Sequence, residues 1–481
     1  MIVMKFGGSS LAGAERIRNV GGIVKAVLKR KPVLVLSALG DTTDHLLEAA
    51  GAALKKGFVS IEKIEEFHLK AIADLDLGAG LQKEVKALFW ELGSLLTGIS
   101  LTRELTGRTR DCLVSFGERM STRIAAAYLR SIKIKAQAVD AWDAGFLSDS
   151  AYGQAELRGE TWIRVSAFVR TLIAEGTLPV ITGFIAKDEN GNITTLGRGG
   201  SDLSATVIAA ACKAEEVQIW KDVDGILTAD PRLVSDARPV DRVTYDEAAE
   251  LAYFGAQVLH PRAMQPCMKT GTPVLVKNSY NPAAPGTRIE AEPDKNSPRI
   301  RAVTSKKNVT LVDIVSTRML GQPGFLAQVF SEFAKNGVSI DMIATSEVSV
   351  SLTLDAGNDL GPVRRELSRY AGVDVKTEKA IVTIVGNVRH SSEILHEAFG
   401  ICEKMRIQVQ MVSQGASKVN ISFIVNDNEA DDLVRELHRF FFSGPGEGEK
   451  KAVRSGSSRR GGKRPPAEEP PAGAAKQGKQ G

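Results

Sequence analysis

A lysine followed closely by two glycines, near the start of the chain, forms the first segment whose residue types suit a chemical role. The segment Lys5-Phe6-Gly7-Gly8-Ser9-Ser10 ends the apolar, strand-like run Ile2–Phe6 and precedes a helical pattern. Small residues let the backbone approach phosphate oxygens, and free N–H groups at a helix N-terminus favour anions. Lys5 would neutralise charge on a phosphoryl group during its transfer. The loop lacks the Walker A pattern, and taken alone it is explained at least as well as an ordinary strand-to-helix turn.

A second glycine-rich segment, Thr195-Leu196-Gly197-Arg198-Gly199-Gly200-Ser201-Asp202, leads into an apolar helix. A guanidinium beside glycines can bind a carboxylate through two hydrogen bonds, so Arg198 indicates recognition of an acidic substrate. Asp202 falls close to the start of the helix, where its carboxylate would either cap the helix or serve the same site.

Polar residues also crowd the end of a predicted strand at Val217–Lys221. They lie in Trp220–Arg232, which contains Asp222-Val223-Asp224-Gly225 and Asp230-Pro231-Arg232. Ligands bind outside the carboxyl ends of strands in open α/β sheets, which makes this segment a candidate for ligand binding. A solvated turn is the alternative.

The fourth candidate is Glu118 in Ser115-Phe116-Gly117-Glu118-Arg119-Met120-Ser121-Thr122. We expect this segment at a strand-to-helix junction, where the carboxylate would bind the ammonium group of a substrate. A glutamate at the start of a surface helix is the alternative.

The elements that must position these residues alternate between strands and helices over residues 1–295. Strands are predicted at Ile2–Phe6, Val33–Leu36, Leu178–Gly183, Val217–Lys221 and Val274–Val276, and a helix at Ala14–Lys29. This alternation predicts α/β architecture with a mostly parallel sheet. The stretch His45–Gly107 has helical periodicity and few strand candidates, so it predicts a helical insertion beside the sheet.

The chain repeats itself after Arg301. Phe330 and Phe399 stand 69 positions apart, as do Met342 and Met411. The matching segments are Val309–Val312, Gly324–Phe330, Val338–Ile343 and Val348–Leu354, then Val382–Val385, Ile394–Phe399, Ile407–Val412 and Val419–Val425. Each copy reads β-α-β-β-α, which predicts two ferredoxin-like α+β units. Two such units after a region of catalytic size indicate a regulatory module.

The formal charge of +5 comes from the end of the chain. Ser443–Gly481 carries nine of the 62 basic and four of the 57 acidic residues, so Met1–Phe442 has 53 of each. A neutral body removes the main support for nucleic-acid binding. The Gly, Pro, Ser, Lys and Arg of the tail predict disorder.

Cysteine usage and hydropathy indicate the compartment. The four cysteines form no C-x-x-C pair or zinc signature, which favours free thiols in a reducing environment. No run reaches the ~18 apolar residues of a membrane helix, and the chain opens into a strand-like run rather than a signal peptide. We therefore expect a cytoplasmic location and no membrane partner.

Taken together, these segments resemble those of the aspartate kinases of the amino acid kinase family, from Met1 to about Phe442. The motifs, in order, are K-F-G-G-S-S, the Ser37-Ala38 plus Thr43 segment, S-F-G-E-R, T-L-G-R-G-G-S-D, D-V-D-G-I with D-P-R, and Gly255-Ala256-Gln257-Val258-Leu259-His260-Pro261. The repeats resemble paired ACT domains, in which Thr345-Ser346-Glu347-Val348-Ser349-Val350 is a typical segment. The resemblance implies an amino acid kinase domain at residues 1–295, ACT domains at 301–375 and 376–442, and a disordered basic tail at 443–481.

The resemblance also implies roles for single residues. Lys5 and Asp202 would be catalytic, with Asp202 organising the catalytic groups. ATP would be bound by Lys5, Gly7, Gly8, Ser9, Lys221, Asp222, Leu227, Arg232 and Gln257. Aspartate would be bound by Ser37, Thr43, Glu118, Arg198 and Ser201, with Arg198 on the α-carboxylate and Glu118 on the amine. Mg²⁺ would ride on the ATP phosphates, without a metal site of the protein's own.

The implied reaction converts L-aspartate and ATP into 4-phospho-L-aspartate and ADP, the first step of lysine, threonine and methionine biosynthesis. The attacking carboxylate is already ionised near neutral pH, so no general base is needed. Catalysis would depend on in-line positioning and charge neutralisation. Many relatives carry a nucleotide-binding lysine where this chain has Gln257. We hypothesise an active enzyme with a shifted nucleotide site, in which Lys221 or Lys277 substitutes or less charge suffices.

Paired ACT domains commonly bind an amino acid between two subunits, so the resemblance implies feedback regulation and a homodimer or higher homo-oligomer. The effector would contact Met319, Gln322, Gly324, Phe325, Leu326, Asp341, Ser346 and Glu347. The carboxylates of Asp341 and Glu347 suit a cationic side chain, so we expect lysine first and threonine second. A purely structural or dimerising module is the alternative.

Two other functions stay open at this point. One is a glutamate or acetylglutamate kinase of the same fold, although S-F-G-E-R and the repeats count against it. The other is a non-catalytic amino-acid sensor, although the retention of Lys5, Arg198 and Asp202 counts against that.

Overall fold

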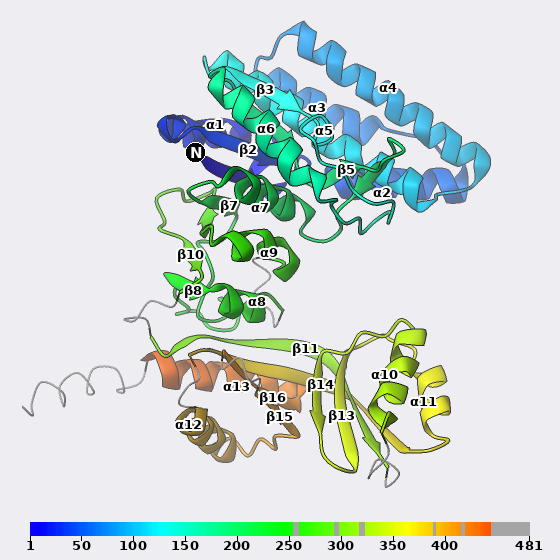
Figure 1. The fold of residues 1–481 in the computed structure, drawn as a ribbon, viewed down its shortest axis with the longest axis vertical. Coiled ribbons are helices and arrows are strands. Elements are labelled where there is room, and N and C mark those ends of the chain that lie inside the picture. The colour runs from blue at the N-terminus through cyan, green and yellow to red at the C-terminus, as the bar shows by residue number, and fades with distance from the viewer. Residues whose placement is uncertain (254–258, 293–297, 317–322, 388–390, 415–418, 444–481) are drawn as a thin grey trace, which may run out of the picture. The chain divides into compact units, whose positions relative to one another are not determined.

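The computed structural model describes residues 1–253, 259–292, 298–316, 323–387, 391–414 and 419–443 (Figure 1). Within this range, Met1–His438 form one unit of packed elements, and Arg439–Ser443 form a π-helical turn. The unit contains two sheets that differ in kind, one mostly parallel and one antiparallel, besides a small hairpin.

An eight-stranded sheet forms the N-terminal part, in the order β3-β4-β2-β1-β7-β9-β10-β8. Its strands are β1 (Ile2–Phe6), β2 (Pro32–Leu36), β3 (Ala136–Val139), β4 (Leu178–Thr182), β7 (Val217–Lys221), β8 (Arg242–Thr244), β9 (Val274–Asn278) and β10 (Thr287–Glu290), beside a hairpin of β5 (Ile185–Lys187) and β6 (Ile193–Thr195). All neighbours in the large sheet are parallel except β9 and β10. The predicted mostly parallel sheet is confirmed.

Strand β1 shows how this sheet is buried on both faces. Ile2, Met4 and Phe6 enter one hydrophobic core, whereas Val3 enters the other. Successive side chains of a strand point to opposite faces, so Lys5 lies on the face of Val3. Helices α1 (Ala14–Ala26) and α5 (Gly107–Ser131) supply the first core, and α6 (Glu160–Ala174), α7 (Gly200–Cys212) and α9 (Pro261–Thr270) supply the second. Lys5 therefore points toward the helices that include α7.

Three helices between β2 and α5 enlarge the first core. They are α2 (Thr42–Lys56), α3 (Glu62–Asp74) and α4 (Ala79–Thr102) (Figure 1). Leu46, Ile72 and Leu92, one from each helix, are buried in the same core as residues of α5. The predicted helical insertion at His45–Gly107 is confirmed.

Six antiparallel strands form the second sheet, in the order β12-β13-β11-β14-β16-β15. They are β11 (Ile300–Val315), β12 (Met342–Thr345), β13 (Ser349–Asp355), β14 (Gly372–Gly386), β15 (Met411–Ser413) and β16 (Asn420–Asn426). The helices of this region are α10 (Phe325–Lys335), α11 (Gly361–Leu367), α12 (Ser391–Lys404) and α13 (Asp427–His438), and α8 (Tyr245–Tyr253) precedes α9. The chain order confirms the predicted β-α-β-β-α pattern in both repeats.

The two long central strands interlock the repeats. The second half of β11 pairs with the first half of β14, where Val315 lies opposite Gly372. The first half of β11 pairs with the second half of β14, where Ile300 lies opposite Gly386. The sheet of the second repeat is thus completed by Ile300–Lys306, which precede the whole first repeat in the sequence.

Several expected boundaries differ from the structure. Residues 375 and 376, where one unit was expected to give way to the next, both lie inside β14. The strands expected from Val338 and Ile407 begin only at Met342 and Met411. Val338 is buried in the core of the first repeat without strand pairing, so its apolar character reflects packing. Helix α1 ends at Ala26, and a 3-10 turn replaces the rest of the predicted helix.

Some of the predictions fall on residues that the structure does not describe. They are the motif residues 255–258, including Gln257, the effector residues Met319 and Gln322, and residues 444–481 of the tail.

Candidate active site

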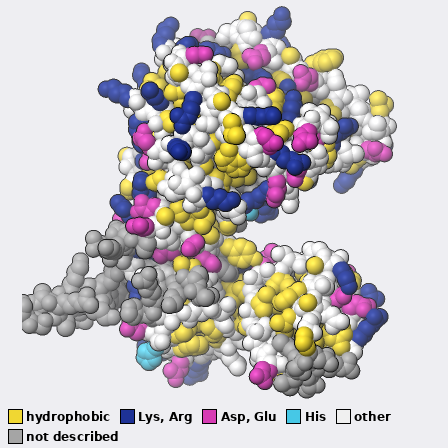
Figure 2. Space-filling model, in the orientation of Figure 1, with side chains coloured by type: hydrophobic (Ala, Val, Ile, Leu, Met, Phe, Trp, Pro, Cys, Tyr) yellow, Lys and Arg dark blue, Asp and Glu magenta, His cyan; other side chains and the backbone are white. Residues whose placement is uncertain are grey.

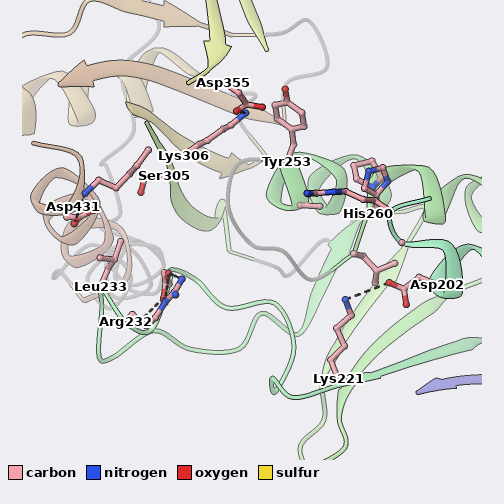
Figure 3. Close-up of a pocket in the computed structure, with 17 residues that line it drawn as sticks. Asp202, Lys221, Arg232, Leu233, Tyr253, His260, Ser305, Lys306, Asp355 and Asp431 are labelled. Carbon is pink, nitrogen blue, oxygen red and sulfur yellow. Dashed lines mark hydrogen bonds and ion pairs between the residues drawn. The ribbon is translucent and has the colours of Figure 1, made fainter. Parts of the chain in front are cut away.

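Three charged side chains meet at the carboxyl ends of two neighbouring strands. Lys5 lies near the end of β1 and Lys221 at the end of β7, which pairs with β1 in parallel. Lys5 Nζ lies 2.7 Å from Asp202 Oδ1. Lys221 Nζ lies 3.7 Å from Asp202 Oδ2, and a dashed line joins this pair in Figure 3. Asp202 is therefore held between two ammonium groups, at the sheet edge where open α/β sheets bind ligands.

Helix α7 presents Asp202 from its first turn. The N-cap residue is Gly199, and no side chain of the described residues forms a capping hydrogen bond there. The capping alternative for Asp202 is therefore wrong: the carboxylate turns toward Lys5 instead of toward the backbone of its own helix. Its charge is still favoured by the positive end of the helix dipole.

The charges of this group set its affinity for anions. Burial alone would raise the pKa of Asp202, but the ammonium groups of Lys5 and Lys221 outweigh it and hold that pKa below its usual value. Burial lowers the pKa of Lys221, although Asp202 opposes the shift. With both lysines protonated, the three side chains carry one net positive charge, which attracts an anion to the end of the sheet.

The glycine loop after β1 packs directly against the segment after β2. The Ser37 N–H donates to the Phe6 carbonyl at 3.2 Å, and the Gly40 N–H donates to the Gly8 carbonyl at 3.1 Å. A Cβ atom on Gly8 would lie 2.8 Å from the carbonyl oxygen of Gly40 and 3.1 Å from that of Ala38. Only glycine fits there, because backbone atoms of the neighbouring segment cannot move aside.

Gly7 and Ser9 complete the loop. The Gly7 N–H donates to the carbonyl oxygen of Trp220 at 3.4 Å, which ties the loop to β7. Ser9–Leu11 form a 3-10 turn, and α1 begins only at Ala14. The helix expected directly after the loop therefore starts later, and the N–H groups nearest the loop belong to the turn.

A cavity of about 330 Å³ lies beside these groups. Its lining residues come from five segments of the chain: Lys5, Gly8, Ser37, Ala38, Gly40, Thr43, Glu118, Phe184, Gly197, Gly199, Gly200, Ser201 and Asp202. They include four of the five residues predicted to bind the substrate, namely Ser37, Thr43, Glu118 and Ser201. The structure thus gathers at one cavity residues that are far apart in the sequence.

Glu118 reaches this cavity from the middle of α5. The expected strand-to-helix junction is wrong, because Ser115–Thr122 lie within a continuous helix of 25 residues. All of them except the partly exposed Arg119 are buried, so the helix packs on several sides. Glu118 Oε1 accepts a hydrogen bond from the Ala38 N–H at 3.2 Å, and Oε2 is buried without a hydrogen-bond partner among the described residues. Burial raises the pKa of Glu118 to about 8. A buried carboxyl oxygen without a partner suits a ligand's ammonium group.

Arg198 lies in the turn between β6 and α7 and is exposed. It lines a neighbouring cavity of about 910 Å³ together with Asp202 and Lys221 (Figure 3). Gly199 and Asp202 line both cavities, so the two adjoin at the start of α7. Gly199 has φ +70°, and a Cβ atom on it would lie 2.7 Å from that of His260, so this sharp turn requires glycine.

The described residues predicted to bind nucleotide after β7 line a third cavity, of about 450 Å³. They are Lys221, Asp222, Leu227 and Arg232. Lys221 also lines the 910 Å³ cavity and binds Asp202, so it links this space to the charged group at the sheet edge. The largely exposed guanidinium of Arg232 is held by Asp230 at 2.6 Å.

The sequence reasoning missed two residues: Phe184, which lines the first cavity, and Asp111, which does not line it but binds the strand before Arg198. Phe184 has φ +70°, unusual for a bulky side chain, and a Cβ atom on Gly200 would lie 2.7 Å from its ring. Asp111, on α5, holds the segment that precedes Arg198 through hydrogen bonds to Thr195. No local pattern marks either residue, because both act through contacts between segments distant in the sequence.

The described effector candidates lie in the first repeat. Gly324, with φ +95°, is the N-cap of α10, and the Phe325 ring is buried in the core of the repeat while Leu326 packs at its edge. Ser346 forms a tight turn before β13, and Glu347 is exposed.

Asp341 is the one effector candidate whose carboxylate is already paired. Lys306 Nζ lies 2.7 Å from Asp341 Oδ2 and 2.8 Å from Asp355 Oδ1. The Tyr253 hydroxyl, at the end of α8, donates to Asp341 Oδ1. Figure 3 shows Tyr253, Lys306 and Asp355 at one end of the 910 Å³ cavity. An effector's ammonium group would have to compete with Lys306 for this carboxylate.

Other site types find little support in the described part of the chain. No group of three or more His, Cys, Asp or Glu side chains is arranged to hold a metal ion among those residues. Likewise, none of the described helices combines the length and apolarity needed to cross a membrane. Figure 2 shows basic and acidic side chains interspersed on one face, in keeping with the balanced charge of Met1–Phe442.

Comparisons with known proteins agree with this fold. The profile of the amino acid kinase family matches residues 1–278, and that of the ACT domain matches residues 312–358 and 382–441. Aspartokinase 1, chloroplastic, of Arabidopsis thaliana is 47% identical to this chain, over 92% of the chain and 80% of the relative. Lysine-sensitive aspartokinase 3 of Escherichia coli is 34% identical, over 92% of the chain and 99% of the relative.

A solved structure extends the likeness to three dimensions. E. coli aspartokinase III in complex with aspartate and ADP has a TM-score of 0.78 and 33% identity, over 92% of this chain and all of that one. The fold and the site define a phosphotransferase of small carboxylic acids. The chain belongs to the amino acid kinase family and, within it, to the aspartokinases.

Proposed function

We propose that the chain transfers the γ-phosphoryl group of ATP to the side-chain carboxylate of L-aspartate, at the cavity between Lys5 and Glu118. The observation that carries the proposal is the buried group of Lys5, Asp202 and Lys221, beside a cavity that Glu118 helps to line. One carboxyl oxygen of Glu118 has no hydrogen-bond partner among the described residues. The E. coli aspartokinase III solved with aspartate and ADP supports this pair of ligands.

Each charged group of the substrate aspartate would bind a different part of the site. Glu118 would bind the ammonium group through its free oxygen, and Arg198 would bind the α-carboxylate with its guanidinium. The hydroxyl groups of the cavity would hold the remaining carboxylate; they belong to Ser37, Thr43 and Ser201. Held in this way, the reacting carboxylate would face Lys5.

The transfer itself would need positioning and charge neutralisation. An oxygen of the aspartate side chain attacks the γ-phosphorus, the bond to the β–γ bridging oxygen breaks, and ADP leaves with that electron pair. The ammonium group of Lys5 would neutralise the negative charge on the phosphoryl group during its transfer, and Asp202 would hold Lys5 and Lys221 in place. The loop at Gly7, Gly8 and Ser9 would approach the phosphates, and the 450 Å³ cavity would hold the rest of the nucleotide.

Mg²⁺ would arrive on the phosphates of ATP. Mg²⁺ binds proteins through few carboxylates, keeps several waters and takes phosphate oxygens as ligands. Once bound, it would neutralise phosphate charge.

A coupled assay of ADP release tests the proposal. We expect turnover with L-aspartate and ATP, and far less with glutamate or N-acetylglutamate at the same concentration. No turnover with any of the three would favour an amino-acid sensor, and preference for glutamate or N-acetylglutamate would assign a different acceptor.

Gly8→Ala should lower kcat/KM for ATP by about tenfold or more, because the added methyl group displaces the loop from the carbonyl oxygens of Gly40 and Ala38. Gly22→Ala in α1 is the matched control, since a Cβ atom there meets nothing within 4 Å. The control should keep its kinetics and gain about 0.5–1 kcal/mol of stability. Steady-state kinetics and thermal melting of both variants check this, and equal kinetic losses would count against the assigned loop.

Lysine is the effector that we propose for the first repeat, in a homodimer or higher homo-oligomer. The E. coli relative is named lysine-sensitive, and a solved structure of aspartokinase III contains lysine and aspartate. The ammonium group at the end of a lysine side chain resembles the Lys306 group that Asp341 binds, so the two are chemically interchangeable partners. Displacement of Lys306 would also alter the surroundings of Tyr253 on α8.

Asp341→Asn should therefore raise the lysine concentration for half-inhibition by about tenfold or more, while kcat without lysine changes little. Asp313→Asn is the matched control, because Asp313 pairs with Lys376 in the same sheet. Inhibition curves with lysine and with threonine measure the effect. Unchanged lysine inhibition in Asp341→Asn would remove Asp341 from the effector site.

A further inference from the structure

Asp111 is a buried carboxylate that the proposed mechanism does not use. It lies on α5 and is 2% exposed. Asp111 Oδ2 accepts hydrogen bonds from the Gly153 N–H and the Thr195 N–H, both at 2.8 Å, and Oδ1 lies 3.0 Å from the Thr195 hydroxyl. Three donors from two separate segments thus converge on one side chain.

This arrangement suits a carboxylate. Oδ2 accepts both backbone hydrogen bonds and Oδ1 accepts the one from the Thr195 hydroxyl, and a negative charge on the acceptors strengthens all three. Asparagine could keep its oxygen on the two backbone N–H groups only by turning its NH₂ group toward the Thr195 hydroxyl, and it would lose the charge. Burial raises the pKa of Asp111, and the hydrogen bonds from Gly153 and Thr195 offset that rise in part. Keeping a charge here has an energetic cost, which points to a role beyond filling space.

Asp111 and Glu118 share one rigid element. Seven residues separate them on α5, close to two turns of helix, so both side chains leave the helix on nearly the same face. Glu118 lines the substrate cavity, and Asp111 accepts a hydrogen bond from the N–H of Thr195 at the end of β6. Helix α5 therefore carries both Glu118, which would bind the substrate's ammonium group, and Asp111, which binds the strand just before the turn of Arg198.

The turn between β6 and α7 carries the guanidinium group of Arg198. Thr195 ends β6, and Arg198 follows three residues later in the turn that leads to α7. The turn is short and constrained, because the Gly200 N–H donates to the Gly197 carbonyl at 3.0 Å. A Cβ atom on Gly197 would lie 3.1 Å from the carbonyl oxygen of Gly153, the second segment that Asp111 binds. The position of Arg198 thus depends on where Asp111 holds Thr195 and Gly153.

We propose that Asp111 is a positioning residue that sets the spacing between the ammonium site at Glu118 and the carboxylate site at Arg198. The proposal rests on the proposed function, in which these two residues bind the two charged groups at the α-carbon of aspartate. Asp111 touches neither substrate. It fixes the separation of their binding groups, so its loss raises the KM for aspartate and leaves the nucleotide site unchanged.

Asp111→Asn tests this in the full-length enzyme. We expect the KM for aspartate to rise by about tenfold or more, with the KM for ATP within about twofold of wild type. Asp188→Asn is the matched control: Asp188 is 3% exposed and accepts several hydrogen bonds, including those from the Asn190 and Asn192 N–H groups, at the other end of the same hairpin. The control should leave both KM values near wild type.

A second variant guards against misfolding of the first. Thr195→Val removes the hydroxyl partner and keeps the backbone donor, so it should shift the KM for aspartate in the same direction by a smaller factor. Its effect should largely vanish in the Asp111→Asn background, because both changes remove the same contact.

The outcomes separate this inference from the proposed function. If wild type does not phosphorylate aspartate, the proposed function fails. If wild type is active and the Asp111 and Thr195 variants keep its KM for aspartate, only this inference fails. Equal rises in both KM values, or the same rise in Asp188→Asn, would show a general loss of structure and would also overturn it.

Discussion

Lys5→Ala is expected to lower kcat by about 100- to 1,000-fold, with a much smaller effect on the KM for aspartate. The reason is that the Lys5 ammonium group would act on charge that develops during phosphoryl transfer, in a buried and water-poor site. Lys5 Nζ lies 2.7 Å from Asp202, so the side chain is already held in place before any substrate binds. Steady-state ADP release at saturating ATP and aspartate measures the loss.

Two further variants make this result interpretable. Among the described residues, removal of Lys5 leaves the buried Asp202 paired only with the more distant Lys221, so some loss of stability should accompany the loss of activity. Lys5→Ala combined with Asp202→Asn should recover part of the melting temperature but none of the activity. Lys25→Ala, an exposed lysine on α1, is the control for charge alone. Activity near wild type in Lys5→Ala would rule out the assigned phosphoryl site.

Glu118→Gln is expected to raise the KM for aspartate by about 10- to 100-fold, since a charge-assisted hydrogen bond to the ammonium group is lost. The glutamine keeps the size of the side chain and can still accept from the Ala38 N–H. The KM for ATP and the melting temperature at neutral pH should change little. Glu66→Gln, on exposed surface of α3, is the control.

The same carboxyl group predicts a pH dependence. Burial raises the pKa of Glu118 to about 8, so below that pH the free enzyme holds a neutral group that must lose its proton to pair with an ammonium ion. The KM for aspartate should therefore fall as the pH rises from 6.5 to 8.5, by at most about tenfold per pH unit. Glu118→Gln should remove this slope. A slope of equal size in the variant would assign the titration to another group.

The parts of the site that lie at strand ends were predictable from the sequence. Lys5 is the second-last residue of an apolar run that two glycines follow, and Lys221 ends another such run, so the local pattern alone placed both at the carboxyl ends of strands. Asp202 was placed near a helix start for the same kind of reason. Its pairing with Lys5, rather than with the backbone of its own helix, is a tertiary contact that no local pattern in the sequence identifies.

Residues inside long buried helices were harder to place. Glu118 lies in a helix whose residues are buried on several sides, and this burial erases the one-sided periodicity that marks a surface helix. Asp111 has no local signature at all, because its three donors come from Gly153 and Thr195, which lie 42 and 84 positions away. Its role becomes visible only when the hydrogen-bond partners are known.

The repeats show a third kind of limit. Their internal similarity correctly predicted two β-α-β-β-α patterns, because each repeat keeps its own hydrophobic spacing. It did not predict that β11 and β14 pair along nearly their whole length. Pairing between strands is a choice among many compatible partners, and the spacing of apolar residues within one strand does not identify its neighbour.

This pairing has a consequence for the synthesis of the chain. Ile300–Lys306 leave the ribosome early, yet their partners begin at Ile381, after 74 further residues. Until then the apolar Ala302 and Val303 stand on an uncovered strand edge, which favours association with other chains. A nascent chain that stalls between the repeats would therefore contain the complete N-terminal sheet and an aggregation-prone strand. That strand is covered only after the second repeat, which contains its partner, has been synthesised.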